Sequence, residues 1–176
     1  MSGKTWFPYI MTEQIYSESV RKIIQNKKAI ENSLKVKLKF NTSNGIITIE
    51  GNPENELIAR EVIEAMSMGF TVLQALDLKN EEFAFLKIPI KAISHRKDLS
   101  QVRARIIGTQ RKALRNIEFL TNCDIVLHDN HVSIIGHNED VKRAAYALRK
   151  LIAGSKHSNV FAYLEEENAK QKAGIQ

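Results

Sequence analysis

Short apolar runs and amphipathic segments follow one another in a regular order through the second half of the chain. Residues 83–93 alternate apolar and polar positions, which predicts a strand, and Pro89 within it indicates an edge position or a bulge. Asp98 is suited to begin a helix and Gly108 to end it, and a second amphipathic helix follows. The remaining patterns predict a strand at 125–127, a turn at 129–130, a strand at 132–135 and a helix at 139–153. The predicted order is therefore strand, helix, helix, strand, strand, helix.

The first half shows the same order less clearly. Its patterns predict a weak strand at 7–11, helical segments within 16–33, strands at 36–40 and 46–50, and a helix from Pro53 to Gly69. Residues 71–78 predict a short extra helix, and the polar residues 79–82 predict a linker.

The two halves also match residue by residue. Val36 aligns with Cys123 and Leu38 with Ile125 at one offset, and Ile49 and Gly51 align with Ile134 and Gly136 at a slightly shorter one. The first copy therefore has the longer connection between its two central strands, at residues 42–45. Self-similarity of this kind indicates one structural unit used twice.

Composition limits the classes of protein to which the chain can belong. Cys123 is the single cysteine, which excludes a disulfide framework and a cysteine-rich zinc site and fits a reducing cytoplasm. No apolar run approaches the roughly 20 residues that a membrane span requires. We therefore expect a cytoplasmic protein without a membrane partner.

Positive charge is concentrated in one window. The chain carries a net charge of +6, and residues 91–115 alone carry +7, eight basic residues minus Asp98. A solvated helix face is the ordinary explanation of such a run. We favour a polyanionic partner, because the window surrounds a glycine between two predicted helices, where a phosphate would bind.

That glycine begins the segment Gly108-Thr109-Gln110-Arg111, which, in the predicted order of elements, resembles the GXXG loop of a KH domain. KH domains use this loop to clamp about four nucleotides of single-stranded RNA. The segment departs from the pattern because Arg111 replaces the second glycine. We expect the guanidinium to bind phosphate in its place; the alternative is that Arg111 blocks a vestigial groove.

The resemblance implies a set of RNA-binding residues around this loop. The basic residues would contact phosphates, whereas Ile125 and His128 would contact bases from the strand side of the groove. The full expected set is Arg103, Arg105, Ile107, Gly108, Thr109, Gln110, Arg111, Lys112, Arg115, Ile125 and His128.

The first copy lacks the loop. Arg21-Lys22-Ile23-Ile24 aligns with it and contains no glycine, so we expect a degenerate domain that serves packing or protein contacts. The expected fold is α+β, with two tandem type I KH domains (βααββα), each a three-stranded antiparallel sheet packed by three helices. The expected boundaries are a degenerate domain at 1–80, an RNA-binding domain at 81–165 and a polar tail at 166–176.

Further motifs narrow the resemblance. They are Arg105-Ile106-Ile107-Gly108, Ile134-Ile135-Gly136 and, most specifically, the segment from Gly154-Ser155-Lys156-His157 to Phe161. With the tandem repeat, they resemble the archaeal form of the Dim/Pno family (partner of Nob-one), whose members are assembly factors of the small ribosomal subunit. The resemblance implies binding of single-stranded rRNA near the 3′ end of the small-subunit rRNA. It also implies contact with the PIN-domain endonuclease that matures this end.

Other chemistry is not indicated. No complete acid–base or nucleophile set is present, so we expect no enzyme, no cofactor and no small-molecule substrate. His128, His131 and His137 cluster around one hairpin, but their spacing matches no common metal site. Two other functions stay open: a general single-stranded RNA-binding protein, and a protein-interaction adaptor with vestigial KH domains.

Overall fold

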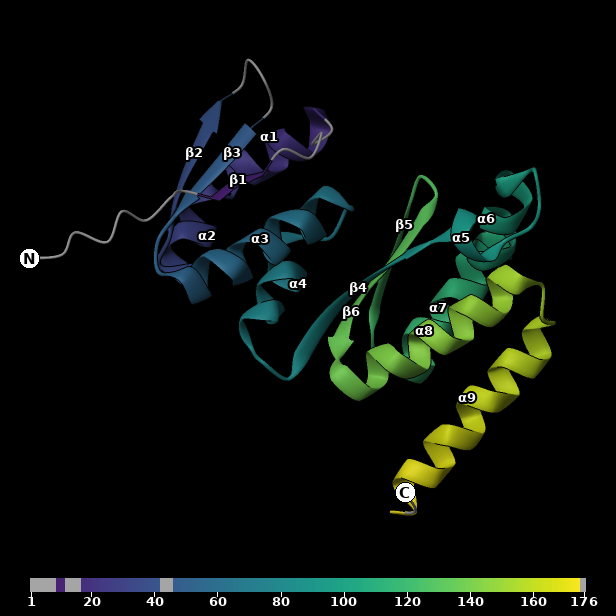
Figure 1. The fold of residues 1–176 in the computed structure, drawn as a ribbon. Helices are drawn as coiled ribbons and strands as arrows, with labels where there is room; N and C mark the ends of the chain where they lie inside the picture. Colours follow the sequence, from purple (N-terminus) through teal and green to yellow (C-terminus); the bar gives the residue numbers. More distant parts are fainter. Residues whose placement is uncertain (1–8, 12–16, 42–45, 175–176) are drawn as a thin grey trace, which may run out of the picture. The chain divides into compact units, whose positions relative to one another are not determined.

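The computed structural model describes residues 9–11, 17–41 and 46–174. The chain divides into two compact units, Met1–Lys79 and Asn80–Gln176 (Figure 1). Each unit combines an antiparallel sheet with helices, so the expected α+β class is confirmed. No helix in these ranges is long and apolar enough to cross a bilayer.

The first unit has its elements in the expected order. They are β1 (Tyr9–Met11), α1 (Ser17–Gln25), α2 (Lys27–Leu34), β2 (Lys37–Asn41), β3 (Ile46–Glu50), α3 (Pro53–Ser67), α4 (Val72–Leu76) and the 3-10 turn η1 (Asp77–Lys79). Local chemistry explains the ends of two helices. Asn52 caps α3 with Pro53 in its first turn, and Thr71 and Gln74 form a reciprocal capping box at α4.

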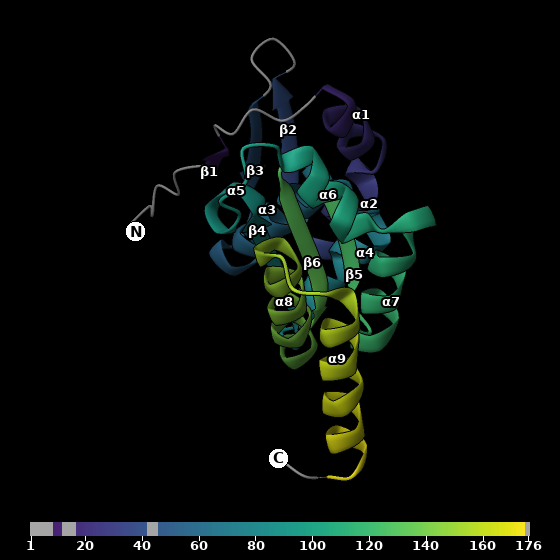
Figure 2. The same cartoon turned by 90° about the vertical axis from the view of Figure 1, so that its right-hand side faces the viewer.

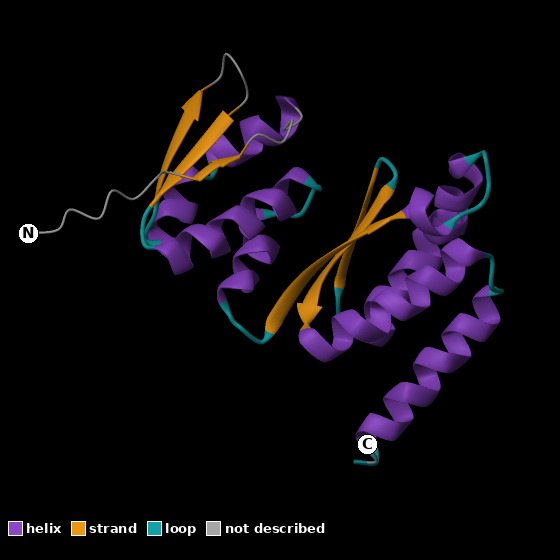
Figure 3. Ribbon diagram, in the orientation of Figure 1, coloured by secondary structure: helices purple, strands orange, loops and turns teal. Residues whose placement is uncertain are grey.

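The second unit follows the same plan with additions. Its elements are β4 (Phe83–Pro89), α5 (Ile90–Ile93), α6 (Leu99–Ile107), η2 (Thr109–Arg111), α7 (Lys112–Thr121), β5 (Asp124–His128), β6 (His131–His137), α8 (Asn138–Ala153) and α9 (His157–Lys172). The helices cover one face of the sheet (Figure 3). Asp98 caps α6 as expected, because its carboxylate accepts a hydrogen bond from the Ser100 N–H.

The two sheets have equivalent strand orders, β1–β3–β2 and β4–β6–β5. The aligned residues also occupy equivalent places, since Leu38 pairs with Ile49 in one sheet and Ile125 with Ile134 in the other. A β-carbon at Gly51 would lie 2.9 Å from Val36 Cγ1, and one at Gly136 would lie 2.6 Å from Cys123 Sγ. Each glycine therefore permits the same close approach of neighbouring strands.

Three expectations need correction or qualification. The strand expected over 83–93 ends at Pro89, because proline lacks the N–H that would extend a ladder, and residues 90–93 form α5. Three helices were expected in each domain, but the second unit adds α9, which begins at His157 and contains the expected tail boundary at 165/166. The longer connection expected at 42–45 lies outside the described residues.

Helix α9 belongs to the core of the second unit. It packs against both α7 and α8 (Figure 2). Val160 and Leu164 are buried in the same apolar cluster as Ile106, Ile117 and the strand residues. The Asn168 amide donates a 2.8 Å hydrogen bond to the Leu120 carbonyl of α7 and accepts one from Arg143 of α8. The segment after Gly154 is thus a fixed wall of the unit.

Candidate nucleic-acid interface

The junction between α6 and α7 has an unusual backbone. Gly108 ends α6 at a φ of 71°, and Gln110 and Arg111 also have positive φ, at 51° and 62°. A β-carbon at Gly108 would lie 2.6 Å from the Ala113 β-carbon, so only glycine fits there without displacement. The side chains of Thr109, Gln110 and Arg111 are exposed. The sequence thus forms a tight, outward-facing loop at the N-terminus of a helix, where backbone N–H groups favour an anion.

The Arg111 side chain contacts two other residues of the same unit. Its guanidinium lies 3.2 Å from a Glu118 carboxylate oxygen and donates a 3.4 Å hydrogen bond to the carbonyl of Ile125 in β5. Strand β5 is at the edge of its sheet, so this side chain covers a strand edge beside the loop. Both contacts use the Nη2 atom, and they hold the guanidinium over the β5 edge. These contacts favour the alternative in which Arg111 covers the groove.

Two of the expected cations serve structural contacts. Arg103 donates a 3.2 Å hydrogen bond to the Asp129 carbonyl and thereby joins α6 to the β5–β6 turn. Arg105 donates to the Gly154 and Ser155 carbonyls at the end of α8. A cation at this point complements the negative end of the helix. Both guanidinium groups therefore have backbone carbonyls as partners.

Lys112 and Arg115 are the cations that the structure leaves available. Both are exposed and lie in the first turns of α7, three residues apart, so their side chains share one face. Within the described ranges, neither side chain has a hydrogen bond or an ion pair, as the contacts of those ranges show. Together with the loop, they form a positive rim at the N-terminus of α7.

The residues expected to line the base-binding side are less exposed than Lys112 and Arg115. The Ile125 side chain is only 1% exposed and belongs to the core, so its carbonyl is the group that faces outward. Ile107 is half-buried at the end of α6. His128 is half-buried at the end of β5, with Nδ1 3.6 Å from an Asp129 carboxylate oxygen. Of these residues, Ile107 and His128 keep part of the side chain exposed.

Sequence reasoning missed the other side of the loop. Here α9 faces the loop across a hollow of about 400 Å³, which we term the loop–α9 hollow. Its lining residues are Ala104, Arg105, Gly108, Thr109, Lys112, Ala113, Asn116, His157 and Phe161. The spacing of His157 and Phe161 was the available signal, because residues four apart share one face of a helix.

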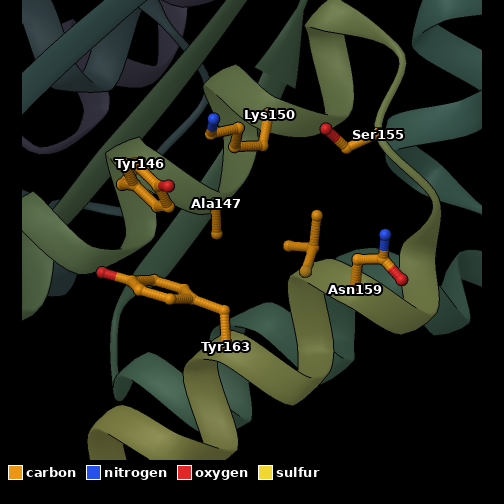
Figure 4. Close-up of a pocket in the computed structure, with 7 residues that line it drawn as sticks. Tyr146, Ala147, Lys150, Ser155, Asn159 and Tyr163 are labelled. Atoms are coloured by element: carbon orange, nitrogen blue, oxygen red, sulfur yellow. The ribbon is translucent and has the colours of Figure 1, made fainter.

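A second hollow lies between α8 and α9. It measures about 250 Å³ and includes Tyr146, Lys150, Asn159 and Tyr163 in its lining (Figure 4). The two tyrosine rings are 4.6 Å apart between centroids, and Lys150 Nζ lies 5.2 Å from the Tyr146 centroid. Burial raises the pKa of Tyr163. No residue of the loop lines this hollow.

Cys123 and His131 are two further side chains with shifted pKa values. Burial raises the pKa of the Cys123 thiol to about 11, which makes it a poor nucleophile. Burial, together with Lys87, lowers the pKa of His131. In the part of the chain that the structure describes, no group of three or more His, Cys, Asp or Glu could hold a metal ion.

Comparisons with known proteins point to one family. Residues 84–169 match a family model for the second KH domain of PNO1, described as a eukaryotic-type, type I KH domain. The KH domain-containing protein MJ0443 of Methanocaldococcus jannaschii is 32% identical over 83% of this chain. The RNA-binding protein pno1 of Dictyostelium discoideum is 27% identical over 92% of the chain, and the pre-rRNA-processing protein pno1 of Aspergillus oryzae is 28% identical over 64%.

A solved structure resembles nearly the whole chain. It is the aDim2p protein in an a/eIF2alpha–aDim2p–rRNA complex from Pyrococcus horikoshii OT3. The identity is 27%, the TM-score is 0.84, and the match covers 95% of this chain and 98% of the other. The chain spans a smaller share of the other relatives: 66% of MJ0443, 77% of the Dictyostelium protein and 45% of the Aspergillus protein.

Proposed function

The chain belongs to the Dim/Pno family of KH-domain proteins, and we propose that it binds single-stranded RNA as an assembly factor of the small ribosomal subunit. Relatives named RNA-binding and pre-rRNA-processing proteins support this proposal, as does the similarity to a protein crystallised with rRNA.

The observation that carries the proposal is the α6–α7 loop with its positive rim. Gly108 allows a backbone turn that other residues adopt only with strain, and Lys112 and Arg115 lie beside it without a protein partner in the described ranges. Such a loop can receive two RNA phosphates, one at the helix N-terminus and one at the ammonium and guanidinium groups. Phosphate contacts of this kind position RNA without reading its sequence.

We further propose that the first unit is a second KH copy without an RNA loop. Its sheet order, its cross-strand pair Leu38–Ile49 and its Gly51–Val36 approach match those of the second unit. Residues 21–24, which align with the loop, lie inside α1, and only Asn26 separates α1 from α2. Residues 21–24 are helical, so their backbone N–H groups are not presented to a phosphate, and this unit would serve packing or protein contacts.

The specific RNA and the specific protein partner that we propose follow from the family resemblance. The RNA would be the 3′ region of the small-subunit rRNA, and the partner would be a PIN-domain endonuclease that cleaves there. The chain itself would be non-catalytic, since it would hold RNA while the partner supplies the metal-dependent chemistry. Cleavage by the purified endonuclease should become faster or more accurate when this protein is added, and this protein alone should cut no RNA.

Fluorescence anisotropy with a labelled single-stranded oligonucleotide of the rRNA 3′ end tests the central proposal. Lys112→Ala and Arg115→Ala should each weaken binding and lower the magnitude of the salt slope by about 0.7. Lys142→Ala is the matched control, because Lys142 is exposed on α8 and pairs with Glu139. It removes the same charge away from the loop and should change the slope little.

Two outcomes would favour the alternative functions. Equal affinity for a shuffled oligonucleotide would indicate a general single-stranded RNA-binding protein. No salt-dependent binding to either oligonucleotide would favour the protein-interaction adaptor.

A further inference from the structure

The loop–α9 hollow is held in place by contacts on several sides. His157 Nε2 donates a 2.9 Å hydrogen bond to the Arg105 carbonyl, and Arg105 in turn binds the carbonyls that precede α9. Buried Val160 and Leu164 fix the following turns of α9. Ala104, Gly108 and Ala113 also line the hollow, and these small residues leave space in it. The hollow is therefore built into the unit before any ligand binds.

Its two walls differ in chemistry. One wall is aromatic, with the His157 and Phe161 rings 5.9 Å apart between centroids. The facing side, formed by the loop and α7, includes Thr109, Lys112 and Asn116. No carboxylate belongs to the lining. An apolar planar face opposite a cation and an amide matches a nucleotide, whose base stacks, whose edge forms hydrogen bonds and whose phosphate is negative.

The hollow is also continuous with the loop. Gly108, Thr109 and Lys112 line it and form the phosphate rim as well. On the opposite side of the loop, the Arg111 side chain lies on Glu118 and on the β5 edge. RNA bound at the loop would therefore have open space on its α9 side and the Arg111 side chain on its β5 side. This continuity and the positive lining favour RNA over a protein side chain as the occupant.

We infer that the loop–α9 hollow holds one nucleotide of the bound single-stranded RNA, with its base stacked on Phe161 and its phosphate at Lys112. This inference rests on the proposed RNA-binding function. It extends the interface beyond the loop to α9, which the βααββα unit does not contain. It also gives Phe161 and Asn116 roles in binding that the loop motif does not imply.

Two substitutions at Phe161 separate stacking from folding. Phe161→Leu keeps an apolar side chain but removes the aromatic face, and we expect it to weaken binding by about 5- to 50-fold. Phe161→Tyr keeps the ring and should bind within about twofold of the unsubstituted protein. Phe119→Leu is the control, because Phe119 on α7 is 83% exposed and does not line the hollow. It should bind RNA like the unsubstituted protein.

The probe is the full chain with the labelled rRNA 3′-end oligonucleotide, followed by versions carrying 2-aminopurine at successive positions. One position should lose fluorescence on binding, and Phe161→Leu should restore it. Unchanged affinity of Phe161→Leu, with weakening by Lys112→Ala, would overturn the hollow and leave the proposed function standing. Absence of salt-dependent binding by the unsubstituted protein would instead overturn the proposed function.

Discussion

Arg111 has a backbone conformation that suits glycine and a side chain that covers a strand edge. Its φ of 62° costs an L-residue on the order of 1 kcal/mol, which its contacts with Glu118 and the Ile125 carbonyl offset in part. The same residue thus explains both how the loop departs from the KH pattern and how the chain tolerates the departure.

We expect Arg111→Gly to bind the rRNA 3′-end oligonucleotide as tightly as the unsubstituted protein or a few-fold more tightly. The substitution relieves the left-handed backbone and uncovers the Ile125 carbonyl. Anisotropy at several salt concentrations measures this, with Arg111→Ala as a control that uncovers the edge but keeps the backbone strain. Weaker binding with a salt slope reduced by about 0.7 would show instead that the guanidinium binds phosphate.

Gly108 combines a positive φ with a lack of space for a side chain. Gly108→Ala should lower the free energy of unfolding by about 2–4 kcal/mol, because it places a β-carbon 2.6 Å from that of Ala113 in addition to the backbone cost. Gly154→Ala is the matched control, since Gly154 has a φ of 107° but no atom within 4 Å of the added carbon. Urea unfolding of both variants should give the smaller loss for Gly154→Ala; equal losses would remove the packing argument.

Among the elements, the strand pair β5–β6 shows how closely the sheet is packed. Gly136 lies against Cys123, whose thiol is 4% exposed and donates a 3.4 Å hydrogen bond to the Thr121 carbonyl. Burial raises the pKa of this thiol from 9.0 to about 11. The burial of Cys123 at this point therefore also affects how the thiol ionises.

This shift makes the unfolding free energy depend on alkaline pH. The folded state keeps its proton more tightly, so the stabilisation is present below about pH 9 and is lost as the pH rises toward about 11. The total loss should be about 3 kcal/mol. Cys123→Val removes the titrating group and copies Val36, which occupies the equivalent place in the first unit. Urea unfolding between pH 8 and 11 should show a flatter profile for Cys123→Val than for the unsubstituted protein.

In the whole molecule, the two units share one order of core elements but present different surfaces. The second unit has a glycine loop and α9, whereas the equivalent segment of the first unit continues as helix α1. Both units have exposed lysines, which in the first unit lie on α1 and α2, although the excess of positive charge lies in residues 91–115 of the second unit. The loop is the physical difference, since it brings backbone N–H groups and cations to one point.

We expect the second unit to supply most of the RNA affinity. In the full chain, Lys112→Ala with Arg115→Ala should weaken binding about tenfold at physiological salt and lower the slope by about 0.7 per residue. Lys22→Ala with Lys28→Ala removes the same charge from exposed positions of the first unit and should change the slope little. An equal effect of both pairs would assign RNA binding to the two units alike.

The sequence by itself determined the order of elements, the internal repeat and the position of the loop. These features depend on local physics: alternation for β2 and β3, the Asp98 cap for α6, and the backbone freedom of Gly108. The alignment of Leu38 with Ile125 and of Ile49 with Ile134 also came from apolar residues recurring at matched places, and the structure then pairs Leu38 with Ile49 and Ile125 with Ile134. Local signals of this kind lie within one element or one turn.

Only the tertiary structure decided which groups the loop region presents. Charge counting treated Arg103, Arg105, Lys112 and Arg115 alike, yet the first two donate to backbone carbonyls of the unit and the last two remain exposed. Arg105 meets Gly154 across a long stretch of chain, and Phe161 reaches the loop only because α9 packs beside α7. Contacts between residues far apart in sequence depend on how complete elements pack, and no local pattern records that packing.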